Sequence, residues 1–275
     1  MSRISIRGLL VLVTNPEGQG STSYSLSLRR RLATRTHKGN SLRIAAFSDY
    51  RVQDLRALID FLKTKATPDL VLYAGDDIHR FQPRGKNLFE EIARVTKYGV
   101  CAVAGNDDQP SIRKQITGRK VFPVHSCALV LGNFAIVGLE GAPLFHGEAG
   151  KNIGRLLYPD GVATLQTKLW NEEPFRKKRL IIVSHAPPLG TLDFAIRFGP
   201  RRIGSKPLCD FLESSSNAIL CVCGHVHRCG GQTATVGKTV VVNAASHDSP
   251  GDPGKVAIIR IKNRKVSAVV WHQLP

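Results

Sequence analysis

Five short strings of polar residues in this 275-residue chain contain side chains that bind metal ions in proteins. They supply carboxylate, amide and imidazole groups, which suit Mn, Fe or Zn better than a site made only of thiolates. A carboxylate such as Asp76 can bridge two ions, and two ions about 3.5–4 Å apart produce a hydroxide nucleophile for phosphoryl transfer. The strings are Ser48-Asp49-Tyr50-Arg51, Gly75-Asp76-Asp77, Gly105-Asn106-Asp107, Ser184-His185-Ala186-Pro187-Pro188 and Gly224-His225-Val226-His227.

Each string is weak evidence when it is taken alone. A Gly-Asp pair after a strand is usually a turn. The spacing of His225 and His227 is more informative, because side chains alternate along an extended chain and both imidazoles would share one face. All five strings follow predicted strands, so the set is much more specific than any member.

The elements that must position these side chains follow from hydrophobic periodicity. Strands and helices alternate in the first half, and the second half is rich in strands, which predicts an α/β sandwich with mixed sheets. Ligands of open α/β sheets bind beyond the carboxyl ends of the strands, where the five strings lie. The predicted helices are Val52–Lys65 and Asn87–Tyr98, and the predicted strands are Leu42–Phe47, Leu70–Ala74, Val100–Ala104, the hairpin Cys127–Leu131 and Phe134–Leu139, Leu180–Ser184, Ala218–Cys223, Thr239–Asn243, Val256–Ile261 and Val266–Trp271.

Taken in order, the strings resemble the motifs of the calcineurin-like metallophosphoesterase superfamily, which read D-x-H, G-D, G-N-H/D, H and G-H-x-H. The similarity covers about residues 42–262 and is strongest at the last four motifs. Gly138-Leu139-Glu140-Gly141, Gly204-Ser205 and Val242-Asn243 also resemble the small phosphodiesterases of that family. The resemblance implies a four-layer α/β/β/α sandwich with two mixed β-sheets over residues 42–275, and a dinuclear metal centre.

The resemblance also implies which residues bind two divalent ions, with Mn, Fe or Zn as the candidates and Asp76 as the bridge. The first ion would be held by Asp49, Asp76 and His227, and the second by Asp76, Asn106, His185 and His225.

The first motif departs from the family pattern, because Arg51 stands where the family has a histidine. A guanidinium has only donors and stays protonated, so it cannot ligate a cation. The first ion therefore loses one of its expected ligands, and three outcomes are open. The first site binds its ion weakly with water in place of the ligand, His79 substitutes, or Arg51 holds Asp49 or a substrate phosphate through a forked contact and leaves a one-metal enzyme. A site that has lost catalysis is a further alternative, against which the retained second-site ligands argue.

Asp107 stands where many family members have a histidine that assists the leaving group. As a general acid it would need a raised pKa, which neighbouring carboxylates and limited solvent could supply. Alternatively, Asp107 and Asp108 cap the segment before Pro110. We take Asp107 as the candidate for leaving-group protonation and Arg51 as the candidate for phosphate binding.

These features predict a metal-dependent phosphoesterase that hydrolyses phosphomonoester or phosphodiester bonds with a metal-bound hydroxide. The expected substrate is a phosphorylated small molecule or a nucleotide. The alternative is a catalytically reduced protein of the same fold that binds phosphate or nucleic acid, in which Arg51 replaces a metal charge. A scaffold for protein partners is a third alternative.

The charge of the chain indicates anionic partners, with 39 Lys and Arg against 21 Asp and Glu and a net charge of +18. Phosphorylated substrates and nucleic acid both fit this charge. We expect residues 1–41 to form a basic extension that is a flexible tail, an organelle-import segment or a nucleic-acid arm. No apolar run approaches the ~20 residues of a membrane-spanning helix.

The six cysteines are expected to be free thiols in a reducing compartment, which predicts a cytoplasmic protein unless residues 1–41 direct import. Cys221, Cys223 and Cys229 surround the two histidines of the last string, so a Cys/His zinc knuckle is a rival interpretation. Their spacing is poor for structural zinc. Strand alternation puts Cys221 and Cys223 on one face, where core packing explains them.

Overall fold

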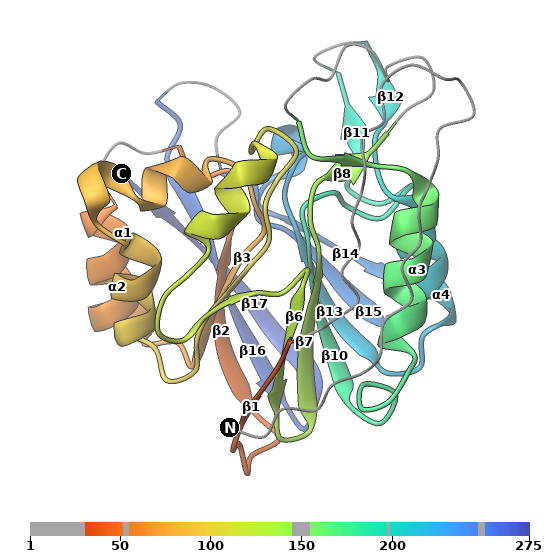
Figure 1. The fold of residues 1–275 in the computed structure, drawn as a ribbon, viewed down its shortest axis with the longest axis horizontal. Helices are drawn as coiled ribbons and strands as arrows, with labels where there is room; N and C mark the ends of the chain where they lie inside the picture. The colour runs from red at the N-terminus through yellow and green to blue at the C-terminus, as the bar shows by residue number, and fades with distance from the viewer. Residues whose placement is uncertain (1–30, 52–54, 145–154, 197–198, 247–250) are drawn as a thin grey trace.

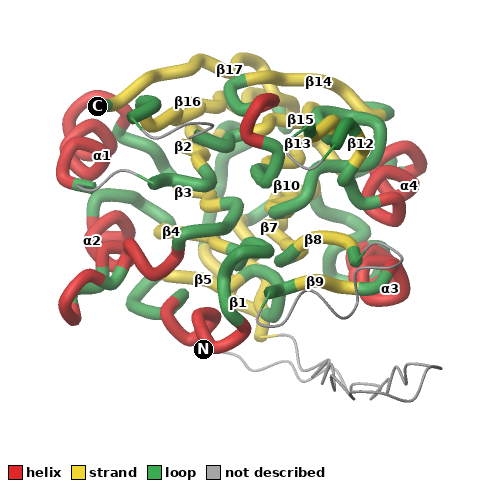
Figure 2. The backbone as a smooth tube through the Cα atoms, turned by 90° about the horizontal axis from the view of Figure 1, so that it is seen from above, coloured by secondary structure: helices red, strands yellow, loops and turns green. Residues whose placement is uncertain are grey.

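The computed structural model describes residues 31–51, 55–144, 155–196, 199–246 and 251–275. Two large mixed sheets lie face to face between two pairs of helices (Figure 1). Figure 2 separates the layers, with α1 (Arg56–Phe61) and α2 (Leu88–Arg94) on one side and α3 (Asp160–Trp170) and α4 (Lys206–Ser214) on the other. The predicted α/β/β/α sandwich is confirmed.

The six-stranded sheet has the order β17-β16-β2-β3-β4-β5. Its four strands from the first half of the chain are parallel, and the hairpin of the last two strands joins the β2 edge antiparallel. The strands are β2 (Leu42–Phe47), β3 (Leu70–Tyr73), β4 (Gly99–Ala102), β5 (Val121–Pro123), β16 (Gly254–Lys262) and β17 (Lys265–Leu274).

The seven-stranded sheet has the order β1-β6-β7-β10-β13-β15-β14. Strands β7, β10, β13 and β15 are parallel, and the predicted hairpin of β6 and β7 is present. The strands are β1 (Arg31–Arg35), β6 (Cys127–Leu131), β7 (Phe134–Leu139), β10 (Arg179–Ser184), β13 (Ala218–Cys223), β14 (Gln232–Val236) and β15 (Thr239–Asn243).

Strand β1 lies inside the predicted basic extension, yet it pairs in parallel with β6 as the edge strand of this sheet. Residues 31–35 therefore belong to the folded unit. Their signal is weak because Leu32 and Ala33 are the two apolar residues among five, and neither is fully buried. The prediction for residues 1–30 lies outside the described residues.

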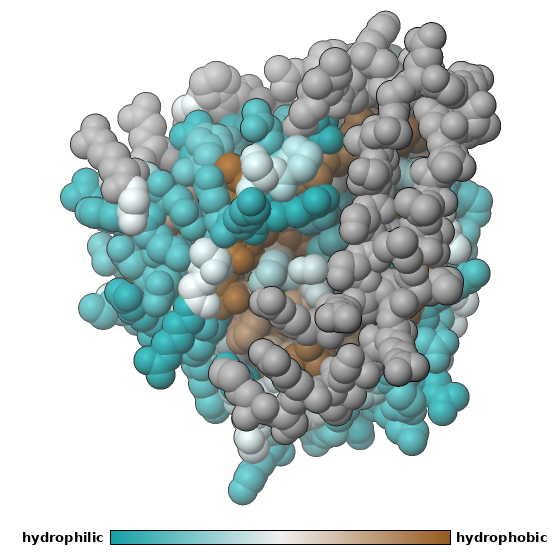
Figure 3. Space-filling model, viewed as in Figure 1, coloured by the Kyte–Doolittle hydropathy of each residue, from teal (hydrophilic) through white to brown (hydrophobic). Residues whose placement is uncertain are grey.

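Three apolar clusters hold the four layers together. One lies between the two sheets and includes Leu72 and Ile181, and the other two lie beneath the helix pairs. Parallel strands covered on both faces must be apolar throughout, which explains why all four residues of β3 are buried. On the face seen in Figure 3, the described side chains are mostly hydrophilic and apolar ones show near its middle.

The helices of the first half are shorter than predicted. The segment predicted as Val52–Lys65 contains α1 and then a π-helix, η1 (Leu62–Ala66), which ends at the left-handed Thr67. Helix α2 begins after Asn87, whose side chain accepts a hydrogen bond from the amide of Glu90. The remaining short elements are the 3₁₀ helices η2 (Ile78–Phe81), η3 (Pro83–Gly85), η4 (Pro110–Gln115) and η5 (His227–Cys229), and the two-residue strands β8 (Ala142–Pro143), β9 (Leu157–Tyr158), β11 (Phe194–Ala195) and β12 (Arg201–Arg202).

Within the described segments, every helix is too short or too polar to cross a membrane.

Candidate metal centre

The five polar strings meet at one edge of the sandwich, beyond the carboxyl ends of β2, β3, β4, β10 and β13. The two sheets join there, because Ser48 after β2 forms a parallel bridge with Ala245 after β15. The amide of Ser48 donates to the carbonyl of Ala244 at 3.0 Å. The edge therefore brings ligands from both sheets together.

Tight backbone geometry directs the acids into this space. Asp49, Asp76 and His225 have left-handed φ angles of 52°, 60° and 66°, which L residues adopt rarely. A Cβ at Gly105 would lie 2.0 Å from Asp76 Oδ1, and one at Gly224 would lie 2.4 Å from Asp49 Oδ2. These two glycines are needed because the backbone passes directly against the carboxylates.

A first group of ligands combines Asp76, Asn106 and His185, all buried. His185 Nε2 lies 2.9 Å from Asn106 Oδ1 and 3.5 Å from Asp76 Oδ2. His185 Nδ1 donates to the carbonyl of Ala74 at 2.7 Å, which fixes the ring and directs Nε2 into the site. Asp76 Oδ1 also accepts from the amide of Asp107 at 2.8 Å.

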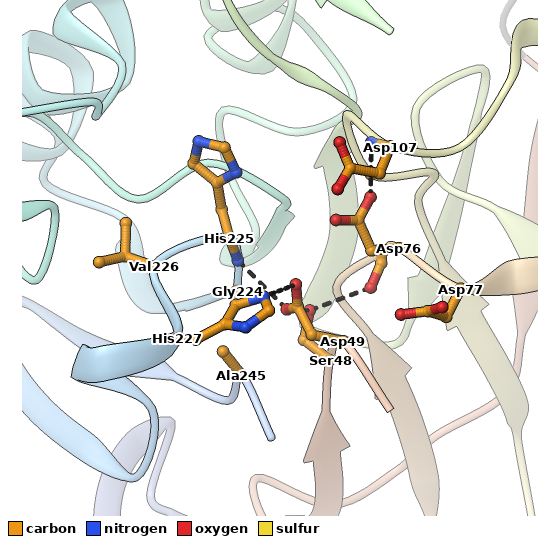
Figure 4. Close-up of polar contacts among 12 residues, drawn as sticks. Ser48, Asp49, Asp76, Asp77, Asp107, Gly224, His225, Val226, His227 and Ala245 are labelled. Carbon is orange, nitrogen blue, oxygen red and sulfur yellow. Dashed lines mark hydrogen bonds and ion pairs between the residues drawn. The ribbon is translucent and has the colours of Figure 1, made fainter. Parts of the chain in front are cut away.

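A second group is formed by Asp49 and His227 (Figure 4). Asp49 Oδ1 lies 2.9 Å from His227 Nε2, and Asp49 Oδ2 accepts from the Ser48 hydroxyl at 2.7 Å and the His225 amide at 3.2 Å. The His225 amide thus bonds to the second group, while its ring lies near the first, with its centroid 5.1 Å from that of His185.

The buried acids and imidazoles perturb each other's protonation. Burial lowers the pKa of His185, but the charge and hydrogen bond of Asp76, together with the charge of Asp49, outweigh it and raise that pKa to about 10. Burial raises the pKa of Asp49, but the hydrogen bond from His227 and the charge of His185 hold it below its usual range. Burial and the charge of His185 together lower the pKa of His225 to about 3. Two buried carboxylates thus face each other with imidazoles as the compensating charge.

This donor set fits a divalent cation. Asp49, Asp76 and His185 each present one ligand atom, and these atoms lie within 4.8 Å of one another. Carboxylate and imidazole donors suit Mn, Fe or Zn. Asn106 and His227 lie within hydrogen-bond distance of members of this trio. The structure therefore brings all six predicted ligands to one place, while the number and kind of ions stay predictions.

Arg51 contacts Asp77, an acid of the second string that was not predicted as a site residue. Its Nε donates to Asp77 Oδ2 at 2.8 Å, and Arg80 Nε lies 3.3 Å from Asp77 Oδ1. The forked contact was expected with Asp49 or a phosphate, so Asp77 is an additional partner. His79 is exposed on η2 and lies outside the trio of ligand atoms, so the predicted substitution by His79 is not seen.

Asp107 and Asp108 are adjacent in sequence but differ in exposure and in their contacts. Asp107 is 45% exposed and contacts Asn106 and the guanidinium of Arg155. Asp108 is buried and accepts from the amides of Gly105 and Ile78, so it braces the loop that carries Asn106. Burial and the charge of Asp76 raise the pKa of Asp108 to about 7. The alternative in which the pair caps the segment before Pro110 is not seen, because η4 begins after Gln109 with no side-chain cap and Asp108 accepts from Gly105 and Ile78 instead. No sequence signal pointed to Arg155.

The zinc-knuckle alternative does not match the packing. All six cysteines are free. Cys221 and Cys223 are buried in the core cluster beneath α3 and α4, and Cys229 lies in a separate small cluster with Ile203 and Val226. The core-packing interpretation of Cys221 and Cys223 is confirmed.

Comparisons with known proteins agree with the fold and the motifs. A curated relative named "Probable glycerophosphodiester phosphodiesterase GpdQ" from Arcobacter nitrofigilis is 26% identical over 189 residues, which are 66% of this chain. This chain spans 64% of that relative's length. A dimetal phosphatase from Danio rerio has a TM-score of 0.50 and 12% identity, over 84% of this chain and 99% of the other.

A second solved structure has a TM-score of 0.60 and 19% identity, over 86% of this chain and all of the other. At these identities the solved structures support the fold alone. The family model described as calcineurin-like phosphoesterase matches residues 37–229, which is more than half of the chain. The chain therefore belongs to the calcineurin-like phosphoesterase family.

Proposed function

We propose that this protein is a metal-dependent phosphoesterase that hydrolyses phosphoric ester bonds with a metal-bound hydroxide. The observation that carries the proposal is the convergence of Asp49, Asp76 and His185, whose ligand atoms lie within 4.8 Å of one another. When bound there, a divalent ion supplies a hydroxide near neutral pH and polarises the phosphoryl oxygens. The family membership supports the same chemistry.

The two hydrogen-bonded groups support a division of the ligands between two ions. Asp76, Asn106, His185 and His225 are assigned to one ion, and Asp49, Asp76 and His227 to the other, with Asp76 shared. Asp76 suits the role of a ligand shared by two ions, because its two carboxylate oxygens have different neighbours. Asp76 Oδ2 lies 3.5 Å from His185 Nε2, and Asp76 Oδ1 accepts from the amide of Asp107. The ion assigned to Asp49, Asp76 and His227 loses the histidine ligand that the family motif has at position 51, so we expect it to be the weaker one.

The rim of the site supplies charges for the substrate. The Arg51 side chain is 34% exposed, which leaves it accessible to an arriving phosphate. Arg155 and Asp107 are 43% and 45% exposed and form an ion pair. Asp107 lies in the loop after β4, and Arg155 lies just before β9. We assign Arg51 to phosphate binding and Asp107 to proton delivery to the leaving group.

We propose a small phosphodiester as the substrate. The relative named as a glycerophosphodiester phosphodiesterase supports this class over a monoester. The net charge of +18 steers any phosphorylated substrate toward the protein. The six free cysteines support a cytoplasmic location.

The test combines metal content with turnover. The purified protein should contain Mn, Fe or Zn by elemental analysis, and it should cleave an aryl phosphodiester only in the metal-loaded form. His185→Ala should lose the turnover and bind less metal than the wild type. Metal-free turnover equal to that of the loaded protein, or a His185→Ala variant that matches the wild type, would sink the enzyme proposal.

A catalytically reduced protein that binds phosphate or nucleic acid is the second candidate. Arg51 at a ligand position and the charge of +18 favour it. Binding to DNA or RNA that weakens steeply with salt, together with absent turnover, would support this candidate, because counterion release sets that slope.

A further inference from the structure

Asp77 is bound by two arginines at the edge of the metal centre. Arg51 Nε lies 2.8 Å from Asp77 Oδ2, and Arg80 Nε lies 3.3 Å from Asp77 Oδ1. The carboxylate of Asp77 is 13% exposed, whereas the two arginine side chains are about one-third exposed, at 34% and 33%. Each Asp77 oxygen therefore holds one guanidinium at the surface of the site.

Arg51 also lies in the field of the metal-binding acids. It follows the buried Asp49 by two residues, and Asp77 directly follows Asp76. Burial lowers the pKa of Arg51, but the hydrogen bond and charge of Asp77, and then the charges of Asp49 and Asp76, raise it. The guanidinium is thus attracted to three carboxylates, two of which belong to the candidate metal site.

A guanidinium that moved onto Asp49 or Asp76 would compete with a metal ion. Guanidinium donors pair with carboxylate oxygens in a fork, and these are the oxygens that a cation needs. Asp77 offers the same chemistry without being a proposed ligand. In Figure 4 the carboxylate of Asp77 lies apart from that of Asp76, so a guanidinium held by Asp77 binds an acid that is not a proposed ligand.

The backbone holds Asp77 firmly in this place. Its φ of 57° is left-handed, and η2 begins at the next residue with the buried Ile78. The amide of Arg80 donates to the carbonyl of Asp77 at 3.0 Å, so Arg80 and Asp77 form one turn. Asp and Asn tolerate left-handed φ better than most residues, so Asp77→Asn should keep this turn.

We infer that Asp77 is a positioning residue that holds Arg51 away from Asp49 and Asp76, so that the metal-binding carboxylates stay available to a cation. This inference rests on the proposed function, because it needs a metal site to protect. It also explains how the site tolerates an arginine in the first motif, because Asp77 binds the guanidinium of Arg51.

The test is a double-mutant cycle read out by the affinity for Mn²⁺ alone, measured calorimetrically on the metal-free full chain. Asp77→Asn should weaken Mn²⁺ binding about tenfold, because the released guanidinium then pairs with the ligands. In the Arg51→Ala background, Asp77→Asn should weaken it by less than about threefold, which is the effect of the lost charge alone. Asp77→Glu keeps the negative charge, so it should retain most of the Mn²⁺ affinity that Asp77→Asn loses.

A matched control removes the same charge far from the site. Asp210 binds Lys206 at 2.8 Å on α4, and Asp210→Asn should leave Mn²⁺ affinity unchanged. Equal effects of Asp77→Asn with and without Arg51 would overturn the inference while leaving the metal site intact. A wild-type chain that binds no Mn²⁺, Fe²⁺ or Zn²⁺ would instead overturn the proposed function, and the inference with it.

Discussion

The two halves of the candidate metal centre are held in different ways. In the half with Asp76, Asn106 and His185, every side chain is buried and bonds within the group or to the backbone. In the half with Asp49 and His227, the motif position occupied by Arg51 is 34% exposed and tied to Asp77. A buried unpaired charge is costly, so the substitution occurs where solvent and a nearby acid stabilise a guanidinium.

The largest effect is expected in the buried half. His185→Ala removes an imidazole that contacts Asn106, Asp76 and the Ala74 carbonyl. We expect turnover of an aryl phosphodiester to fall at least about a hundredfold and one metal ion per chain to be lost. His272→Ala, which alters a ring against Phe61 outside the site, should change neither. Comparable losses in both variants would contradict the assignment of His185.

The two glycines that touch the carboxylates should separate the halves. Gly105→Ala places a Cβ 2.0 Å from Asp76 Oδ1 and 2.4 Å from the Asp76 amide, and Gly224→Ala places one 2.0 Å from Ser48 Oγ. Each should cost about 1–3 kcal/mol of unfolding free energy. Gly105→Ala should also weaken the tighter metal ion, whereas Gly224→Ala should weaken the other.

The control for both variants is a glycine with free space. A Cβ at Gly161, in the first turn of α3, would meet nothing within 4 Å. Gly161→Ala should therefore be neutral or raise the unfolding free energy by up to about 1 kcal/mol. Denaturant unfolding and metal titration on the three variants test the comparison, and Gly105→Ala with unchanged metal binding would break it.

Arg51→His should bring the metal affinity of the half with Asp49 and His227 closer to that of the buried half. The imidazole restores the ligand type that the family motif has at this position, so the ion held by Asp49 and His227 should bind about tenfold more tightly. Metal content should rise toward two ions per chain, and turnover should rise with it. Unchanged stoichiometry would mean that the weakness of this half has a different origin.

The smallest expected effect is the release of a proton from His185 when the metal ion binds. Burial lowers the pKa of His185, but the charge and hydrogen bond of Asp76, together with the charge of Asp49, raise it to about 10, above its ordinary value of 6.5. Between pH 6.5 and about pH 10, the metal-free His185 imidazole therefore carries a second proton. The ring must release this proton before its nitrogen can bind a metal ion. Metal binding at pH 8 should therefore release about one proton and strengthen as the pH rises. Calorimetry in buffers of different ionisation enthalpy measures this release, and His185→Ala should abolish it.

The parts of the site that could be predicted from sequence are those fixed by local order. Asp49, Asp76 and Asn106 each follow a strand that its apolar run identifies, and parallel strands must end at a common edge. The partner of Arg51 could not be predicted, because Asp77 lies 26 residues away and its distance depends on how β2 and β3 pair. Arg155 was missed for the same reason, since it is 48 residues from Asp107.

The fold shows the same division. The buried strands β2, β3 and β13 were predicted because every position is apolar or nearly so. Helices α3 and α4 were not assigned bounds, and their burial of Trp170 and Phe211 depends on packing against the seven-stranded sheet. The left-handed Thr67 ends η1, which continues α1, and Val95 ends α2; periodicity does not reveal either boundary.

The edge strand β1 decides where the chain can be shortened. A fragment that starts at residue 42 loses the partner of β6, a strand whose five residues Cys127–Leu131 are all buried. An apolar strand with an open edge recruits other chains, so this fragment should aggregate. A fragment that starts at residue 31 keeps the β1 and β6 pairing from Arg31 with Cys127 to Arg35 with Leu131, and should aggregate less than the fragment that starts at residue 42.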